Sequence, residues 1–157
     1  MHTLRCLTLL ALLTAPAQAQ VLRHAALGFG AQSSHEHPTF VTGEVGFAVA
    51  HSWLVAGTVR HSAWHGMDGW RAQLTLQRRV AHGTVRPYLG AGLSWTNEEH
   101  EMAWDGSEFG AMALVGLEIP VVQPSGSTLL LFAEADLYTH HYATGQVLFG
   151  ARWQFGR

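Results

Sequence analysis

The stretch VRPYLGAGLSW, Val85 to Trp95, decides the fold. Read with a period of two, its odd-numbered positions are all apolar, whereas its even-numbered positions carry arginine, tyrosine, glycine and serine. Successive side chains of a β-strand point to opposite faces, so this strand has one face in water and the other in an apolar medium. That medium is either a protein core or a lipid bilayer.

The same alternation recurs along the chain and predicts eight β-strands separated by turn residues. The expected strands cover residues 22–32, 40–50, 53–63, 70–80, 85–95, 108–119, 129–138 and 146–155. Connections after the second, fourth and sixth strands are short, those after the first, third and fifth are longer and more polar, and the last, HHYATG, is again short. This arrangement is typical of an antiparallel meander in an outer membrane, with both termini at the short-turn end, which would be periplasmic.

Residues 1–19 have the features of a secretory signal peptide. Arg5 supplies a positive charge, residues 6–15 form an apolar run, and Ala17-Gln18-Ala19 is a small-x-small cleavage site. We expect cleavage after Ala19, which leaves residues 20–157 as one outer-membrane β-barrel domain.

Two features of the pattern favour lipid over a protein core. The polar face combines arginines and acidic residues in nearly equal number with many glycines, which would make room for large charged side chains inside a narrow eight-stranded barrel. Aromatic residues on the apolar face lie near strand ends, as in the interfacial girdles of membrane barrels. We therefore predict an all-β, eight-stranded antiparallel up-and-down transmembrane β-barrel. A soluble lipocalin-like barrel that binds an apolar ligand is the alternative.

Charged residues on the polar face form the first candidate site. In a lumen they would pair with one another, stabilise the barrel and leave it non-conducting, whereas proton transfer is the alternative role. The predicted lumen charge network is Glu44, Arg60, Arg71, Arg79, Arg86, Glu118, Glu134, Asp136 and Arg152. On the apolar face, Arg23 and Arg78 fall near strand ends, where they could meet headgroup phosphates.

Histidines gather at the longer-loop end of the expected barrel, beside acidic residues. Such a rim could bind zinc, nickel or copper, or change its charge with pH. No spacing matches a closed zinc site, so we expect no resident cofactor. The candidate metal ligands are His35, His37, His65, His100, His140 and His141.

The phrase RPYLGAGLSW resembles the fifth strand of small outer-membrane barrels of the OmpA, OmpX and OmpW type. The ending GARWQF is similar to the assembly signal of outer-membrane proteins, with Gly150, Trp153 and Phe155 at the signal positions, although Gly156 and Arg157 follow the last aromatic residue. The resemblance implies insertion into the outer membrane of a diderm bacterium, with membrane lipid and the assembly machinery as partners. It implies a structural or surface-interaction role, with loops that could meet a surface ligand.

The same end of the chain resembles lipid A deacylases of the PagL type in one respect. Those barrels carry a histidine on their last strands, a serine two residues later and a nearby acid, whereas His141 is followed two positions on by Ala143. Thr139 and His141 share a strand face, so a hydroxyl and an imidazole could meet. Deacylation is therefore the minor alternative, and we expect no enzymatic activity. With 9 basic against 11 acidic residues, the net charge gives no indication of nucleic-acid binding.

Overall fold

The computed structural model describes residues 21–33, 39–64, 67–80, 83–98, 106–139 and 143–155. The expected signal peptide and its cleavage site lie outside these residues. The described chain forms eight strands: β1 Val21–Gln32, β2 Thr39–Ala50, β3 Trp53–Trp64, β4 Met67–Arg79, β5 Arg86–Glu98, β6 Gly106–Val122, β7 Ser127–Thr139 and β8 Ala143–Phe155. No helix in these segments is long and apolar enough to cross a bilayer.

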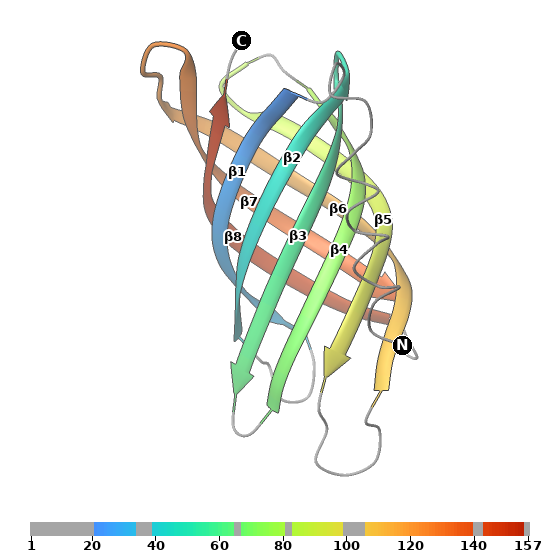
Figure 1. Cartoon of the computed structure of the whole chain (residues 1–157). Helices are drawn as coiled ribbons and strands as arrows, with labels where there is room; N and C mark the ends of the chain where they lie inside the picture. Colours follow the sequence, from blue (N-terminus) through green and yellow to red (C-terminus); the bar gives the residue numbers. More distant parts are fainter. Residues whose placement is uncertain are drawn as a thin grey trace.

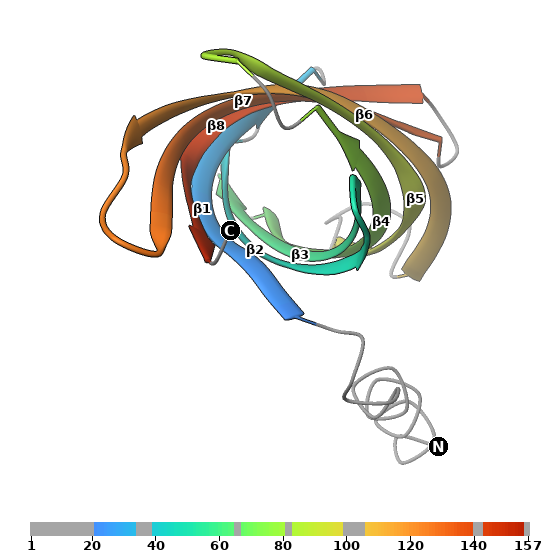
Figure 2. The ribbon, with the colours of Figure 1, turned by 90° about the horizontal axis from the view of Figure 1, so that it is seen from above.

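The strands close into a barrel (Figure 1). Each strand pairs with its neighbours in sequence in antiparallel register, and β1 pairs with β8 to complete the ring seen in Figure 2. The short turns and the C-terminal end of β8 lie together at the top of Figure 1. The predicted eight-stranded up-and-down topology is therefore confirmed.

The connection between β3 and β4 differs from the expectation. The sequence predicted strands over residues 53–63 and 70–80 joined by a longer polar loop, but β3 continues to Trp64 and β4 begins at Met67, so that these two residues pair directly. The polar residues of this segment indicated a loop. In the structure, however, the two strands pair across it, and the His61 ring stacks on the Trp70 ring with centroids 4.3 Å apart. Cross-strand ring pairs of this kind stabilise a hairpin, even where the residue composition of the segment indicates a loop.

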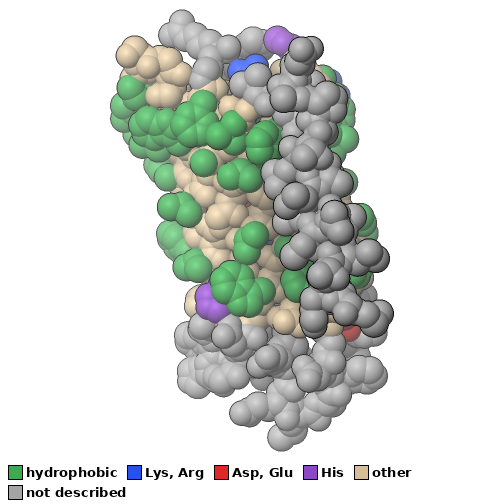
Figure 3. Space-filling view, viewed as in Figure 1, with side chains coloured by type: hydrophobic (Ala, Val, Ile, Leu, Met, Phe, Trp, Pro, Cys, Tyr) green, Lys and Arg blue, Asp and Glu red, His purple; other side chains and the backbone are tan. Residues whose placement is uncertain are grey.

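Apolar side chains cover the outside of the barrel. Leu27 is 74% exposed and Phe109 is 79% exposed, whereas Arg60 and Gln77 on the other face are 3% and 0% exposed. Figure 3 shows green hydrophobic side chains over this outer surface between the two rims. The soluble lipocalin-like alternative requires the reverse assignment of faces, so the structure contradicts it.

Inward-facing glycines lie opposite aromatic rings on the neighbouring strand. The directly paired residues are Gly30 and Phe40, Gly46 and His24, Gly116 and Tyr88, and Gly150 and Phe132. A Cβ atom at any of these glycines would overlap the paired ring or the adjacent backbone. The sequence suggested that glycines make room for charged groups; at these positions they make room for aromatic rings, which also fixes the strand register.

We expect Gly116→Ala to lower the free energy of unfolding by about 1–3 kcal/mol, because the added methyl group overlaps the Tyr88 ring. Equilibrium unfolding in urea, with the protein folded in detergent micelles, measures the change. Gly57→Ala is the matched control, since no atom lies within 4 Å of a Cβ built at that outward position. Equal destabilisation by both substitutions would contradict the role assigned to the glycine and ring pairing.

Candidate functional site

Strand alternation brings the charged side chains of the polar face together in the lumen. Buried side chains from β2, β3, β4, β6, β7 and β8 contribute to it: Glu44, Arg60, Arg71, Glu118, Glu134, Asp136 and Arg152. Arg79 is slightly more accessible, with 13% of its side chain exposed. Arg86 lies apart at the short-turn end, where its Nε donates to the Gly83 carbonyl at 3.4 Å, and it forms no ion pair within the described part of the chain.

The short-turn cluster comprises Arg79, Arg152, Glu44, Glu118 and His24. Arg152 is fully buried and lies between two carboxylates: its Nη2 is 2.6 Å from Glu44 Oε1, and its Nη1 pairs with Glu118. Arg79 also pairs with Glu118, and its Nη2 lies 3.9 Å from Glu44 Oε1. The two arginines and the two glutamates balance in charge, as burial in a medium of low dielectric requires.

Sequence reasoning did not single out His24, which is 1% exposed. Its Nε2 lies 2.6 Å from Glu44 Oε1, while Glu44 Oε2 accepts hydrogen bonds from Thr58 at 3.3 Å and Gln77 at 3.4 Å. The sequence does contain a pattern that indicates this position: counting back from Gly28 in steps of two places His24 on the polar face of the strand. The register irregularity between Leu22 and His24 interrupts that pattern at the start of β1.

The loop-end cluster comprises Arg60, Arg71, Glu134, Asp136 and Tyr138. Arg60 Nη2 lies 2.5 Å from Asp136 Oδ2 and 3.4 Å from Glu134 Oε1. Arg60 Nη1 also donates to Tyr138 Oη. The guanidinium carbon of Arg71 lies 4.5 Å from the centroid of the Tyr138 ring, which is within the range of a cation–π interaction.

Tyr88 joins the two clusters. Its hydroxyl donates to Glu134 Oε2 at 2.8 Å, and the guanidinium carbons of Arg79 and Arg152 lie 5.0 and 5.1 Å from its ring centroid. A continuous set of ion pairs, hydrogen bonds and ring contacts therefore extends along the lumen.

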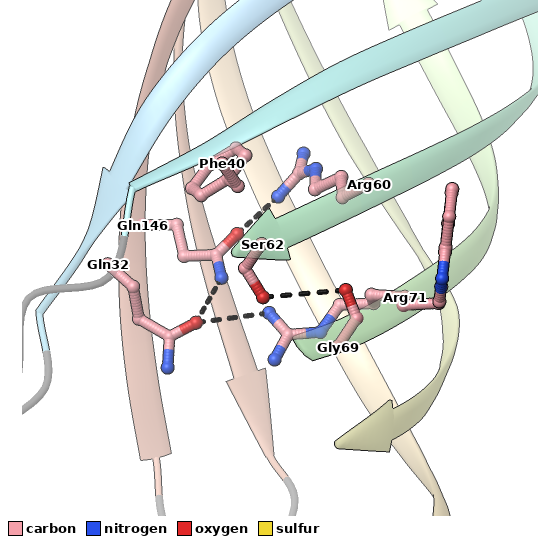
Figure 4. A pocket seen from close by; sticks show the side chains of 8 residues that line it. Gln32, Phe40, Arg60, Ser62, Gly69, Arg71 and Gln146 are labelled. Carbon is pink, nitrogen blue, oxygen red and sulfur yellow. Dashed lines mark hydrogen bonds between the residues drawn. The ribbon is translucent and has the colours of Figure 1, made fainter. Parts of the chain in front are cut away.

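A small cavity of about 20 Å³ lies in the lumen toward the loop end. Figure 4 shows Gln32 and Gln146 on one side of it and Arg60, Ser62 and Arg71 on the other, joined by hydrogen bonds. This volume has room for about one water molecule. Its polar groups are better suited to water than to an apolar ligand.

The predicted metal-binding histidines all lie outside the described residues, so that site stays a prediction. Within the described segments, no three His, Cys, Asp or Glu side chains form a group that could hold a metal ion.

The predicted assembly-signal residues lie on both faces of β8. Gly150 pairs with Gly28 and faces the lumen. A side chain at this position would overlap the Phe132 ring, so packing as well as the assembly signal favours glycine here. Trp153 points outward and is 38% exposed, and Phe155 is the last residue of the strand. Their role in assembly stays a prediction.

The residues compared with lipid A deacylases lie at the loop end of β7 and β8. Thr139 pairs directly with Ala143, and the Thr139 hydroxyl donates to the Ala111 carbonyl at 3.3 Å. His141 lies outside the described residues, so the proximity of its imidazole to that hydroxyl stays untested.

We expect Arg152→Gln to lower the free energy of unfolding by about 3–5 kcal/mol, because it removes the fully buried guanidinium that pairs with both Glu44 and Glu118 and, within the described residues, leaves Arg79 as the one arginine beside these two carboxylates. Urea unfolding of the refolded protein measures this loss. Arg86→Gln removes the same charge outside the clusters and should change stability by about 0.5 kcal/mol or less. An Arg152 variant as stable as the Arg86 variant would contradict the importance of the short-turn cluster.

Comparison with known proteins identifies the fold but no sequence family. No family model and no curated protein matches the chain. The crystal structure of Neisserial surface protein A aligns with 87% of this chain and 96% of its own, with a TM-score of 0.60 and 13% identity. The N-terminal β-barrel domain of OprF from Pseudomonas aeruginosa aligns with 85% of this chain and 98% of its own (TM-score 0.58, 14% identity).

A third similar structure is the outer membrane enzyme PagL, which aligns with 85% of this chain and 99% of its own (TM-score 0.51, 10% identity). At such low identities the similarity concerns the fold. The closed ring, the eight antiparallel strands and these alignments agree, and the chain has the fold of the small eight-stranded outer-membrane β-barrels.

Proposed function

We propose that this protein is a small integral outer-membrane β-barrel with a filled, non-conducting lumen and a structural or surface-interaction role. One observation carries the proposal: the apolar face of the strands points outward and the charged face points inward. In water, each large apolar side chain on the outside would forgo roughly 1.5–3 kcal/mol of burial free energy. A bilayer supplies that burial, and a closed barrel leaves no backbone edge exposed to lipid.

Aromatic side chains at both ends of the outer surface support a membrane-spanning orientation. Trp53 and Trp153 lie on the outer face toward the short turns, and Trp70 and Phe109 lie on it toward the loops. Indole and phenyl rings at these heights match the two interfaces of a bilayer. The apolar band between them is the part in contact with hydrocarbon.

The lumen contacts support the non-conducting part of the proposal. Arg60 and Arg152 are 3% and 0% exposed, and each is paired with two carboxylates. An ion that crossed the barrel would have to displace these pairs, at several kcal/mol for each broken pair. The lumen groups therefore act as structural partners of one another.

In the proposed orientation, residues 1–19 direct export, both termini are periplasmic, and the assembly machinery recognises the end of β8. The histidine-rich loops then face outward, where a surface ligand would meet them. Structures with this fold include Ail, an attachment invasion locus protein of Yersinia pestis, and the enzyme PagL. One fold thus serves different roles, and within the described residues Ala143 stands where a deacylase of the PagL type would have its serine.

We expect the protein to sediment with outer membranes and to migrate differently on gels before and after boiling, because a closed barrel resists detergent until it is heated. Fractionation followed by electrophoresis of boiled and unboiled samples tests both points. Soluble material without a shift would overturn the proposal.

Two arginine substitutions sharpen this test. Leu74→Arg places a charge on the outward face of β4 and should destabilise the folded barrel by about 2–4 kcal/mol if that position faces the middle of the bilayer. Thr84→Arg adds the same charge in the exposed turn before β5 and should change stability by about 0.5 kcal/mol or less.

We also expect the reconstituted barrel to give no steady conductance in planar lipid bilayers, because the lumen is closed by ion pairs along its length. Current recording in symmetric salt measures this, with a bilayer lacking protein as the control. Stable, uniform current steps from the pure protein would contradict the non-conducting lumen.

A further inference from the structure

Among the strand side chains that the structure describes, the formal charges of the outer face lie at the short-turn end. On the apolar face of the strands that the structure describes, the formally charged residues are Arg23, which is half-buried at the register irregularity of β1, and Arg78, which is exposed. Arg23 is the third residue of β1, which begins at the short-turn end, and Arg78 is the penultimate residue of β4, which ends there. On the face seen in Figure 3, arginine atoms lie at the upper rim, above the apolar band.

These two arginines differ from those of the lumen in their partners. Arg60, Arg79 and Arg152 all form ion pairs with carboxylates. Within the described segments, neither Arg23 nor Arg78 makes an ion pair or a side-chain hydrogen bond. A guanidinium has five N–H donors and keeps its charge at any physiological pH, so it needs acceptors from outside the protein.

The neighbouring tryptophans indicate where these acceptors lie. Arg78 pairs directly with Trp53, and its guanidinium carbon is 5.8 Å from the centroid of the Trp53 ring. Trp153 pairs with Ala25, two residues along β1 from Arg23. Because outward tryptophans favour the bilayer interface, both guanidiniums lie at the depth of lipid headgroups. The acceptors found there are phosphate oxygens, which a guanidinium binds through two parallel hydrogen bonds.

We infer that Arg23 and Arg78 bind the phosphate groups of anionic glycerophospholipids in the leaflet at the short-turn end. The inference rests on the proposed function, in which the apolar band spans a bilayer and the short turns are periplasmic. Phosphate also occurs on the glycolipid of the opposite leaflet, but the position of both arginines at the short-turn end selects the phospholipid leaflet. Trp53 holds the Arg78 side chain against the barrel at that depth.

Tryptophan quenching in vesicles tests this inference. The full protein is folded into phosphatidylcholine vesicles that contain either brominated phosphatidylglycerol or brominated phosphatidylcholine, and the relative quenching gives the preference for the anionic lipid. We expect the unmodified protein to prefer phosphatidylglycerol, and Arg23→Gln and Arg78→Gln each to reduce that preference by about fivefold. The preference of the unmodified protein should also fall when salt is added.

Arg86→Gln is the matched control, because it removes one positive charge at the same end of the barrel from a residue that does not lie on the outer face. Its preference should equal that of the unmodified protein. If the Arg23 and Arg78 variants insert and keep the full preference, or if the preference is insensitive to salt, the inference is overturned. A protein that inserts into neither kind of vesicle contradicts the proposed function itself, and the inference falls with it.

Discussion

The arrangement of Arg152 between Glu44 and Glu118 is the interaction on which the lumen depends. These three residues belong to β8, β2 and β6, so the fully buried guanidinium joins strands on both sides of its own. Arg60 on β3 reaches Glu134 and Asp136 on β7, which lies four strands away around a ring of eight. A charge inside so narrow a barrel has no access to bulk water and must find its counter-ion on another strand.

That requirement determines the rest of the barrel. Once the charged face of each strand turns inward, the two-residue period turns the apolar face outward, and the outer surface becomes compatible with lipid rather than water. The remaining lumen volume is filled by rings that lie over glycines, such as Tyr88 over Gly116. Arginines of the described strands therefore differ in their surroundings: Arg60, Arg79 and Arg152 pair with carboxylates in the lumen, whereas Arg78 lies over the Trp53 ring on the outer face.

The sequence predicts the strands and their faces well because alternation is a local property. It predicts less well whatever depends on contacts between strands. The longer loop expected between the strands over residues 53–63 and 70–80 is replaced by pairing that continues to Trp64 and Met67, beyond the stacked rings of His61 and Trp70. Which carboxylate pairs with which arginine depends on the stagger of the closed ring, and no single strand contains that information.

The contacts in the lumen also limit where function can lie. Arg60, Arg79 and Arg152 already form ion pairs with the lumen carboxylates, and the cavity near the loop end holds about 20 Å³. A solute that entered would have to replace these partners with equally good ones, which a small neutral molecule cannot do. In the proposed function, recognition by this barrel therefore involves its outer surface and the segments that join its strands, while the lumen contacts hold the strands together.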